Sequence, residues 1–187
     1  LRLLHPDMQY VMGLAQFHYI VGLHATGRSE EAVEFSQRQL GLHRERPALM
    51  LRVLLGLCTV HYERANVPAL HAVAATFIRV AREAGLGLSI GWSQYALGWP
   101  LYQRNDLAGA EACFRDLASI LPVVHGRVLL DGYTGLALTL LAQGRFGEAL
   151  AEVAALREHL VERSMLALAP VVDSLYQRIL LAHDPQA

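Results

Sequence analysis

Cys58 and His61 are the residues whose types and spacing come nearest to a metal site. Three positions apart on a helix, a thiol and an imidazole would face one side and could reach the same ion. A zinc site needs three or four such ligands, however, and the sequence has no second pair at ligand spacing nearby. His18 and His24 are six positions apart and would lie on different helix faces. We therefore expect no bound metal and no cofactor.

The sequence lacks the short motifs that nucleophilic and phosphate-handling enzymes use. It contains no G-x-S-x-G nucleophile turn, and a phosphate-binding G-x-x-x-x-G-K is excluded because the chain has no lysine. Glu30, Glu31 and Asp116 are interpreted as charges on helix surfaces, and Glu30 and Glu31 also suit the positive end of a helix. We therefore expect a protein that is not an enzyme.

An aromatic stripe is the pattern that points to binding. Its residues follow each other at steps of three, four and three, which puts all four rings on one face of a helix: Trp92, Tyr95, Trp99 and Tyr102. Recognition surfaces use aromatic rings with polar tips, but buried aromatic stripes are also common in cores. Pro100 lies inside this helix and is expected to kink or loosen it. The stripe is therefore interpreted either as a groove or as core packing.

The helices that must carry these residues belong to a repeat with a period near 39 residues. Four segments share a turn-like start, a small residue five positions later and an apolar helical run. The small residues, separated by 37, 41 and 39 positions, are Ala32, Ala69, Ala110 and Ala149. Nine positions before them stand the aliphatic residues Leu23, Val60, Leu101 and Leu140. An alanine fits where the two helices of a hairpin cross closely.

Each repeat is predicted to be a pair of helices joined by a short turn. The second helix of each pair is expected to begin at Ser29, Asn66, Asn105 or about Arg145, and the serine and the two asparagines are favoured capping residues. No segment alternates with period two for long enough to predict a strand. We therefore expect an all-α fold, a right-handed superhelical array of about nine helices in antiparallel pairs. The expected repeats, within one domain of residues 1–187, are 6–43, 47–84, 88–121 and 125–162, with a half repeat at 164–183.

The third and fourth repeats resemble the tetratricopeptide repeat. In "YALGWPLYQRNDLAGAEACF" the matching columns hold Leu97-Gly98, Asn105-Asp106, Ala110 and Phe114. In "GLALTLLAQGRFGEALAEV" they hold Leu136-Ala137, Gly144, Phe146 and Ala149. The first two repeats depart from the pattern, with Ser36 and Val73 in the aromatic column. Repeats of about 39 residues with long helices are similar to the helical repeat domain of large ATP-binding LuxR-type regulators and of related bacterial signalling ATPases and cyclases.

The resemblance implies a non-catalytic module that binds a protein or peptide partner, or a small effector, in an aromatic-lined concave groove. It also implies that the chain is a piece of a longer bacterial regulator or signalling ATPase, with an ATPase domain and an output domain elsewhere. Two alternatives are a structural self-association module and a free-standing peptide-binding adaptor. The groove columns would hold Trp92, Tyr95, Trp99, Tyr102, Gln103, His61, Tyr62, Cys58, Phe17 and His24.

Composition and charge exclude several partners. The 16 basic residues are all arginines and are interspersed with 17 acidic ones, so we expect no binding of nucleic acid. The longest uncharged run, 84–103, is too rich in glycine and polar residues for a membrane span. Cys58 and Cys113 are isolated, which suits a reducing cytoplasm. The last predicted helix has apolar residues that no following helix covers, so a homodimer through the terminal helices is also expected.

Overall fold

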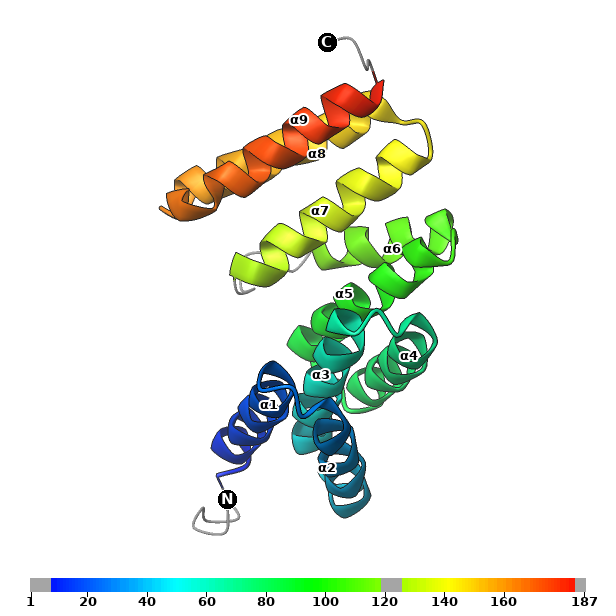
Figure 1. Ribbon diagram of the computed structural model, residues 1–187, viewed down its shortest axis with the longest axis vertical. Helices are drawn as coiled ribbons and strands as arrows, with labels where there is room; N and C mark the ends of the chain where they lie inside the picture. The colour runs from blue at the N-terminus through cyan, green and yellow to red at the C-terminus, as the bar shows by residue number, and fades with distance from the viewer. Residues whose placement is uncertain (1–7, 119–125, 184–187) are drawn as a thin grey trace. The chain divides into compact units, whose positions relative to one another are not determined.

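The computed structural model describes residues 8–118 and 126–183, and this part of the chain is helical (Figure 1). It contains nine α-helices, one short 3₁₀ helix and no strand, which confirms the expected all-α fold. The α-helices are α1 (Gln9–Ala25), α2 (Ser29–Leu42), α3 (Pro47–Glu63), α4 (Val67–Glu83), α5 (Gly87–Gln103), α6 (Leu107–Ala118), α7 (Gly126–Ala142), α8 (Phe146–Glu162) and α9 (Ala169–His183). The 3₁₀ helix is η2 (Leu166–Leu168).

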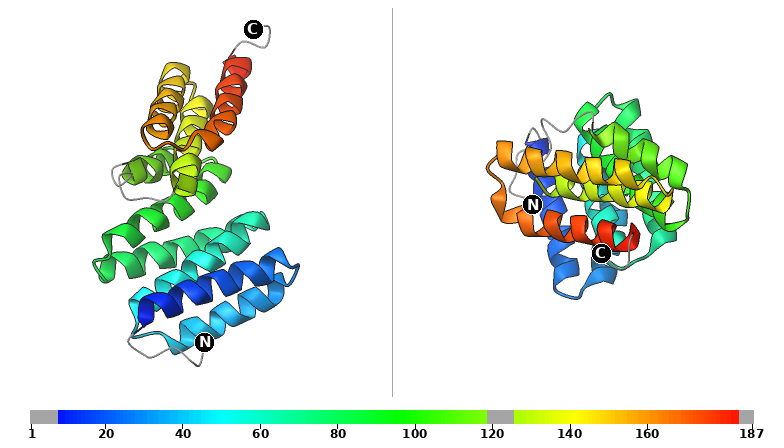
Figure 2. Two further views of the ribbon diagram at one scale, coloured as in Figure 1. Left: turned by 90° about the vertical axis from the view of Figure 1, so that its left-hand side faces the viewer. Right: turned by 90° about the horizontal axis from the view of Figure 1, so that it is seen from above.

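The chain divides into two compact units, an N-terminal unit of residues 1–100 and a C-terminal unit of residues 101–187. In the N-terminal unit, α1 packs on α2 and on α3, and α3 packs on α2 and α4 (Figure 2). In the C-terminal unit, α7 contacts α6, α8 and α9. Within each unit, α1 to α4 and α6 to α9 therefore pack on their neighbours along the chain, and α1 and α7 also contact the next helix but one, as in a helical repeat. The boundary lies inside α5, directly after Pro100.

The four turns inside the helix pairs share one hydrogen-bond pattern, which fixes how the repeats align. In each, the N–H that follows the turn donates to a carbonyl five residues earlier, and these pairs are Arg28–Leu23, Asn66–His61, Asp106–Leu101 and Arg145–Leu140. The residue before the donor has a positive φ in every case: Gly27, Ala65, Asn105 and Gly144. This is the Schellman ending of an α-helix.

The turns correct the alignment of the second repeat by one residue. The residue four positions after the donor is Ala32, Ala110 or Ala149 in three repeats, and all three are fully buried. In the second repeat that position holds Leu70, which is 4 % exposed, whereas Ala69 is half-buried. The assignment of Ala69 to this column was wrong, because a leucine takes the place of the alanine. In the second repeat the position equivalent to Leu23 is likewise occupied by His61 and not by Val60.

The helix caps differ in part from the expected ones. Asn66 does cap α4, since its side-chain oxygen accepts from the N–H of Ala69 at 3.2 Å. Asn105 instead occupies the left-handed turn position, and the side chain of Asp106 accepts from the N–H of Gly109 at 3.0 Å. The Ser29 hydroxyl lies 2.8 Å from Nδ1 of His24. Two of the three predicted caps therefore have other roles.

The core of the N-terminal unit lies between α1, α3, α4 and α5. One cluster of buried side chains surrounds Phe77 of α4, and it includes Leu54 and Leu55 of α3 and Ala96 of α5. Close approach of α1 and α3 is set by Gly56, since a Cβ there would lie 3.2 Å from the side chain of Ile20. None of the helices in the described residues is long and apolar enough to cross a membrane.

Candidate binding surface

The common turn identifies equivalent residues on α1, α3 and α5 of the N-terminal unit. Counting back 14, 11, 7 and 4 residues from each turn donor gives the positions that the tetratricopeptide resemblance assigns to the groove. These residues, which we call the candidate binding face, are Leu14, Phe17, Val21 and His24 on α1, Arg52, Leu55, Thr59 and Tyr62 on α3, and Trp92, Tyr95 and Trp99 on α5. Most of them are half-buried, as expected for side chains at a surface rather than in a core.

The corrected alignment moves Cys58 and His61 from the expected groove into the core. Cys58 is 3 % exposed and His61 8 % exposed. Burial raises the pKa of the Cys58 thiol, so the thiolate that would bind a metal is disfavoured. Burial, together with the charge of Arg64, lowers the pKa of His61 and favours the neutral imidazole. No group of three or more metal-ligating side chains occurs among the residues that the structure describes.

The aromatic stripe is partly surface and partly core. Trp99 is only 8 % exposed, and its ring lies 5.9 Å from that of Tyr62, centroid to centroid. Trp92 and Tyr95 are half-buried, and Tyr62 is 39 % exposed. Pro100 is confirmed inside α5, and beyond it the half-buried Tyr102 and the exposed Gln103 belong to the C-terminal unit.

Phe17 and His24 have different roles on α1. Phe17 is half-buried and packs against the core cluster around Phe77. His24 joins three helix ends, because its Nδ1 lies 2.8 Å from the Ser29 hydroxyl and its Nε2 lies 3.1 Å from a carboxylate oxygen of Glu63. These two contacts occupy both ring nitrogens, so His24 holds the ends of α1, α2 and α3 together.

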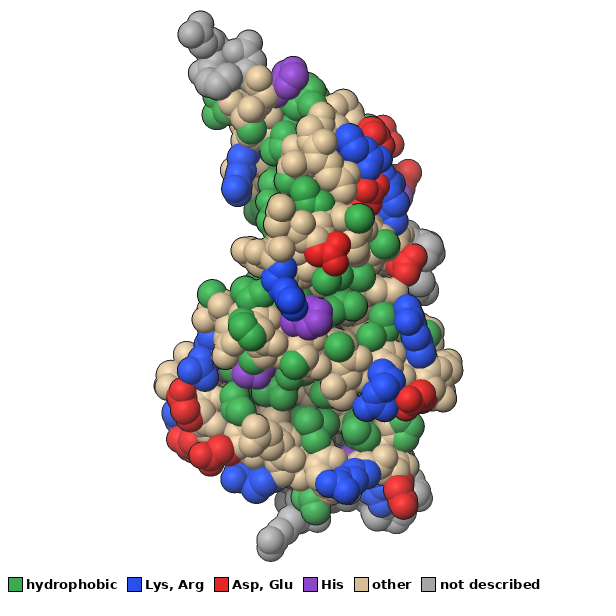
Figure 3. All heavy atoms as spheres, turned by 90° about the vertical axis from the view of Figure 1, so that its right-hand side faces the viewer, with side chains coloured by type: hydrophobic (Ala, Val, Ile, Leu, Met, Phe, Trp, Pro, Cys, Tyr) green, Lys and Arg blue, Asp and Glu red, His purple; other side chains and the backbone are tan. Residues whose placement is uncertain are grey.

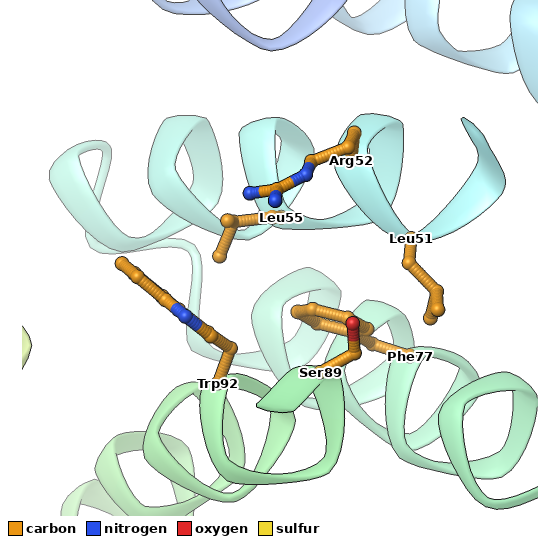
Figure 4. Close-up of a pocket in the computed structure, with 6 residues that line it drawn as sticks. All are labelled: Leu51, Arg52, Leu55, Phe77, Ser89 and Trp92. Carbon is orange, nitrogen blue, oxygen red and sulfur yellow. The ribbon is translucent and has the colours of Figure 1, made fainter. Parts of the chain in front are cut away.

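A small pocket opens between α3, α4 and α5 at one end of the candidate binding face (Figure 4). Leu51, Arg52 and Leu55 line it from α3, and Phe77 lines it from α4; α5 contributes Ser89 and Trp92. In Figure 4 the guanidinium of Arg52 lies beside Leu55, and Trp92 rises from α5 toward α3. The cavity volume is about 20 Å³, which is room for about one water molecule or the end of a small side chain.

Arg52, Leu55 and Thr59 are residues of this face that the sequence did not identify. With the second repeat aligned on Ala69, the predicted groove residues of this helix included Cys58 and His61, which are both buried. In the corrected alignment the positions of the face on α3 are held by Arg52, Leu55, Thr59 and Tyr62. Tyr62 was already a candidate, and it keeps its place on the face.

Elsewhere charges of both signs are mixed on the surface. Figure 3 shows one face on which arginines lie close to carboxylates, with hydrophobic side chains between them. In the C-terminal unit, Glu111 accepts from Arg115 at 2.8 Å and from Arg145 at 2.7 Å, and these two hydrogen bonds lower the pKa of Glu111 to about 2 despite the opposing effect of burial. The first pair lies within α6 and the second joins α6 to the start of α8, so both have a structural role.

Comparison with known proteins finds one family in part of the chain. Residues 91–116 and 132–155 each match the tetratricopeptide repeat family. No curated protein and no solved structure matches the chain. The two matches and the all-helical architecture support a tetratricopeptide-like helical repeat domain. Because repeats of this family generally mediate protein–protein interactions, they support a binding module and give no indication of catalysis.

Proposed function

We propose that the chain is a non-catalytic module that binds an extended segment of a partner protein along the candidate binding face. The observation that supports this is the row of equivalent, mostly half-buried side chains on α1, α3 and α5. Tyr62 and Trp92 provide rigid aromatic surface, which binds at a small loss of side-chain entropy. Leu14, Phe17 and Val21 provide aliphatic and aromatic surface beside it.

The wider setting of this module is also a proposal. The resemblance in repeat length and helix length favours a bacterial transcriptional regulator of the LuxR type or a related cytoplasmic signalling ATPase. In such a protein, occupancy of the face would be communicated to other domains. A free-standing peptide-binding adaptor would use the same face with a different partner.

The test uses the 187-residue chain as bait for a library of random 12-residue peptides displayed on phage. Peptides that are selected would then be synthesised and titrated while tryptophan emission is recorded. The chain has only two tryptophans, and both belong to the candidate binding face, so binding there should change the emission. Failure to select any peptide, or selected peptides that leave the emission unchanged, would contradict the proposal.

A second candidate function, self-association, is favoured by the surface of η2 and α9. Four large apolar residues there are exposed by 40–61 %: Leu166, Val171, Tyr176 and Leu181. Pairing of two copies through these side chains would remove apolar surface from water. Sedimentation velocity should then show a dimer that Val171→Ser with Leu181→Ser converts to a monomer. A wild-type chain that stays monomeric at high concentration would rule this candidate out.

A further inference from the structure

We propose that Arg52 recognises an acidic side chain of the bound peptide, and that the pocket beside it holds the end of that side chain. This inference rests on the proposed function and names the chemistry of the partner. It starts from the corrected alignment, which places an arginine on the face where the other helices of the N-terminal unit carry Leu14 and Trp92.

The charge of Arg52 is not neutralised within the part of the chain that the structure describes. Its guanidinium carbon lies 5.4 Å from the centre of the Tyr10 ring, and no carboxylate is within ion-pair distance of it. Arg28 and Arg79 of the N-terminal unit do have acidic partners, Glu31 and Glu83. Arg44, Arg46 and Arg82 have no such partner among the described residues, but these three are exposed. Arg52 is also half-buried, and a charge in such a place attracts an anion more strongly than one in open water.

The Arg52 side chain is held in position by its neighbours. A Cβ added to Gly13 would lie 2.9 Å from Cγ of Arg52, so α1 passes directly over the aliphatic stem of this arginine. The Tyr10 ring then lies against the guanidinium. An arginine fixed in this way loses less entropy when it forms a two-pronged hydrogen bond with a carboxylate.

The pocket fits a small group beside apolar surface. Its volume of about 20 Å³ leaves room for the tip of a side chain and not for a ring. Leu55 and Phe77 provide apolar walls, and the Ser89 hydroxyl is the polar group that lines the pocket from α5. The expected ligand is therefore a peptide in which an aspartate or glutamate stands next to apolar residues. The acidic side chain would enter the pocket, and the apolar side chains would lie on Trp92 and Phe17.

One positive charge in an otherwise mostly apolar row also determines how the peptide lies. The apolar residues of the face tolerate several alignments of an apolar peptide. A charge-assisted hydrogen bond at Arg52 favours the one alignment that places the acid in the pocket. Arg52 is thus expected to set the specificity of the face.

The test applies the peptide selection to the full chain with Arg52→Gln, Arg52→Lys and Arg79→Gln. Displayed peptides have no free C-terminus, so an acid that is selected must be a side chain. We expect wild-type peptides to share an aspartate or glutamate next to an apolar residue. Changing that acid to its amide, in C-terminally amidated synthetic peptides, should weaken binding about tenfold. Arg52→Gln should cause the same loss, Arg52→Lys a smaller one and Arg79→Gln none.

The outcomes separate this inference from the function on which it rests. Peptides without a shared acid, or binding that Arg52→Gln leaves unchanged, would overturn the role of Arg52 while the binding function stands. A requirement for a free C-terminal carboxylate in synthetic peptides would overturn it as well. Selection of no peptide at all would contradict the proposed function itself. Circular dichroism melts of each variant show that any loss of binding is not a loss of folding.

Discussion

The rings of Tyr62 and Trp99 lie 5.9 Å apart, with their planes inclined by 57°. Tyr62 is near the end of α3 and Trp99 near the end of α5, and both occupy positions of the candidate binding face. At the other end of the same two helices, Arg52 and Trp92 line one pocket. The face therefore continues along α3 and α5, from the pocket at one end to the Tyr62–Trp99 ring pair at the other.

Trp99→Ala should lower the stability of the N-terminal unit, because the Trp99 side chain is packed against Tyr62 and nearly excluded from water. Removal of a buried aromatic ring costs about 3–5 kcal/mol in free energy of unfolding. Trp92→Ala should cost less, since Trp92 is half-buried, and should weaken peptide binding instead. Urea unfolding of the two variants, followed by circular dichroism, measures the difference. Equal losses of stability would contradict the division of the stripe into core and surface.

His61→Leu should stabilise the protein. His61 occupies the position that Leu23, Leu101 and Leu140 hold in the other repeats, and no hydrogen-bond partner for its buried Nδ1 lies in the described part of the chain. A leucine removes this unsatisfied group at similar volume, with an expected gain of about 1 kcal/mol. His71→Leu on α4 is the control for a general effect of hydrophobicity. A loss of stability specific to His61→Leu would show that the imidazole has a required role.

Acidification should destabilise the N-terminal unit through His43 as well as His61. Burial and the charge of Arg46 lower the pKa of His43 below its ordinary value of 6.5, and its Nε2 lies 3.0 Å from the amide nitrogen of Gln16. A histidine with a lowered folded pKa contributes stability above its unfolded pKa, and this is lost as pH falls through 6.5 toward the folded value. The midpoint of unfolding in urea should therefore be lower at pH 5 than at pH 7.5.

The variant His43→Gln provides the comparison for this pH dependence. It removes the titrating ring and keeps a neutral polar side chain near Gln16 and Gln39. The drop in unfolding midpoint between pH 7.5 and pH 5 should be smaller in His43→Gln than in the wild type. An identical drop would show that His43 does not contribute to it.

Ala65→Gly should stabilise the turn between α3 and α4. Ala65 has φ 53°, a left-handed conformation in which a Cβ is unfavourable by about 1 kcal/mol. The equivalent turns at Gly27 and Gly144 have glycine there, with φ 80° and 76°. Gly144→Ala is the reciprocal variant and should lose a similar amount. Thermal melts in which the two changes have the same sign would contradict this explanation.

Much of the fold could be predicted from the sequence, because glycines, asparagines and prolines mark most of the turns. Among the four turns inside the helix pairs, the alanine at 65 is the exception. It adopts the left-handed conformation that glycine or asparagine adopts in the other three, and Leu70 replaces the expected alanine in the following helix. With neither a glycine or asparagine in the turn nor an alanine at position 70, the sequence was aligned on the nearby Ala69, which is one residue before the correct position. Only the backbone hydrogen bond between Asn66 and His61 determines the alignment.

This shift of one residue in the alignment decided which candidate site residues were expected on the surface. One position along a helix is a rotation of about 100°, which exchanges the core side of α3 for the side that lines the candidate face. Cys58 and His61 were therefore placed in the groove, and Arg52 was overlooked. On α1 and α5, Gly27 and the Asn105-Asp106 pair mark the turns. There the predicted residues of the N-terminal unit all lie on the candidate binding face: Phe17, His24, Trp92, Tyr95 and Trp99.

Nuclear magnetic resonance of the ¹⁵N-labelled chain tests the location of the binding face most directly. A synthetic peptide from the phage selection would be titrated while the backbone amides and the two indole N–H signals are followed. Binding along the face should shift the Trp92 indole signal and the amides around Phe17, Arg52 and Tyr62, and leave the exposed sides of α2 and α4 unchanged. Shifts confined to α2 and α4, or an unchanged Trp92 signal at saturation, would contradict the assignment of this face as the binding surface.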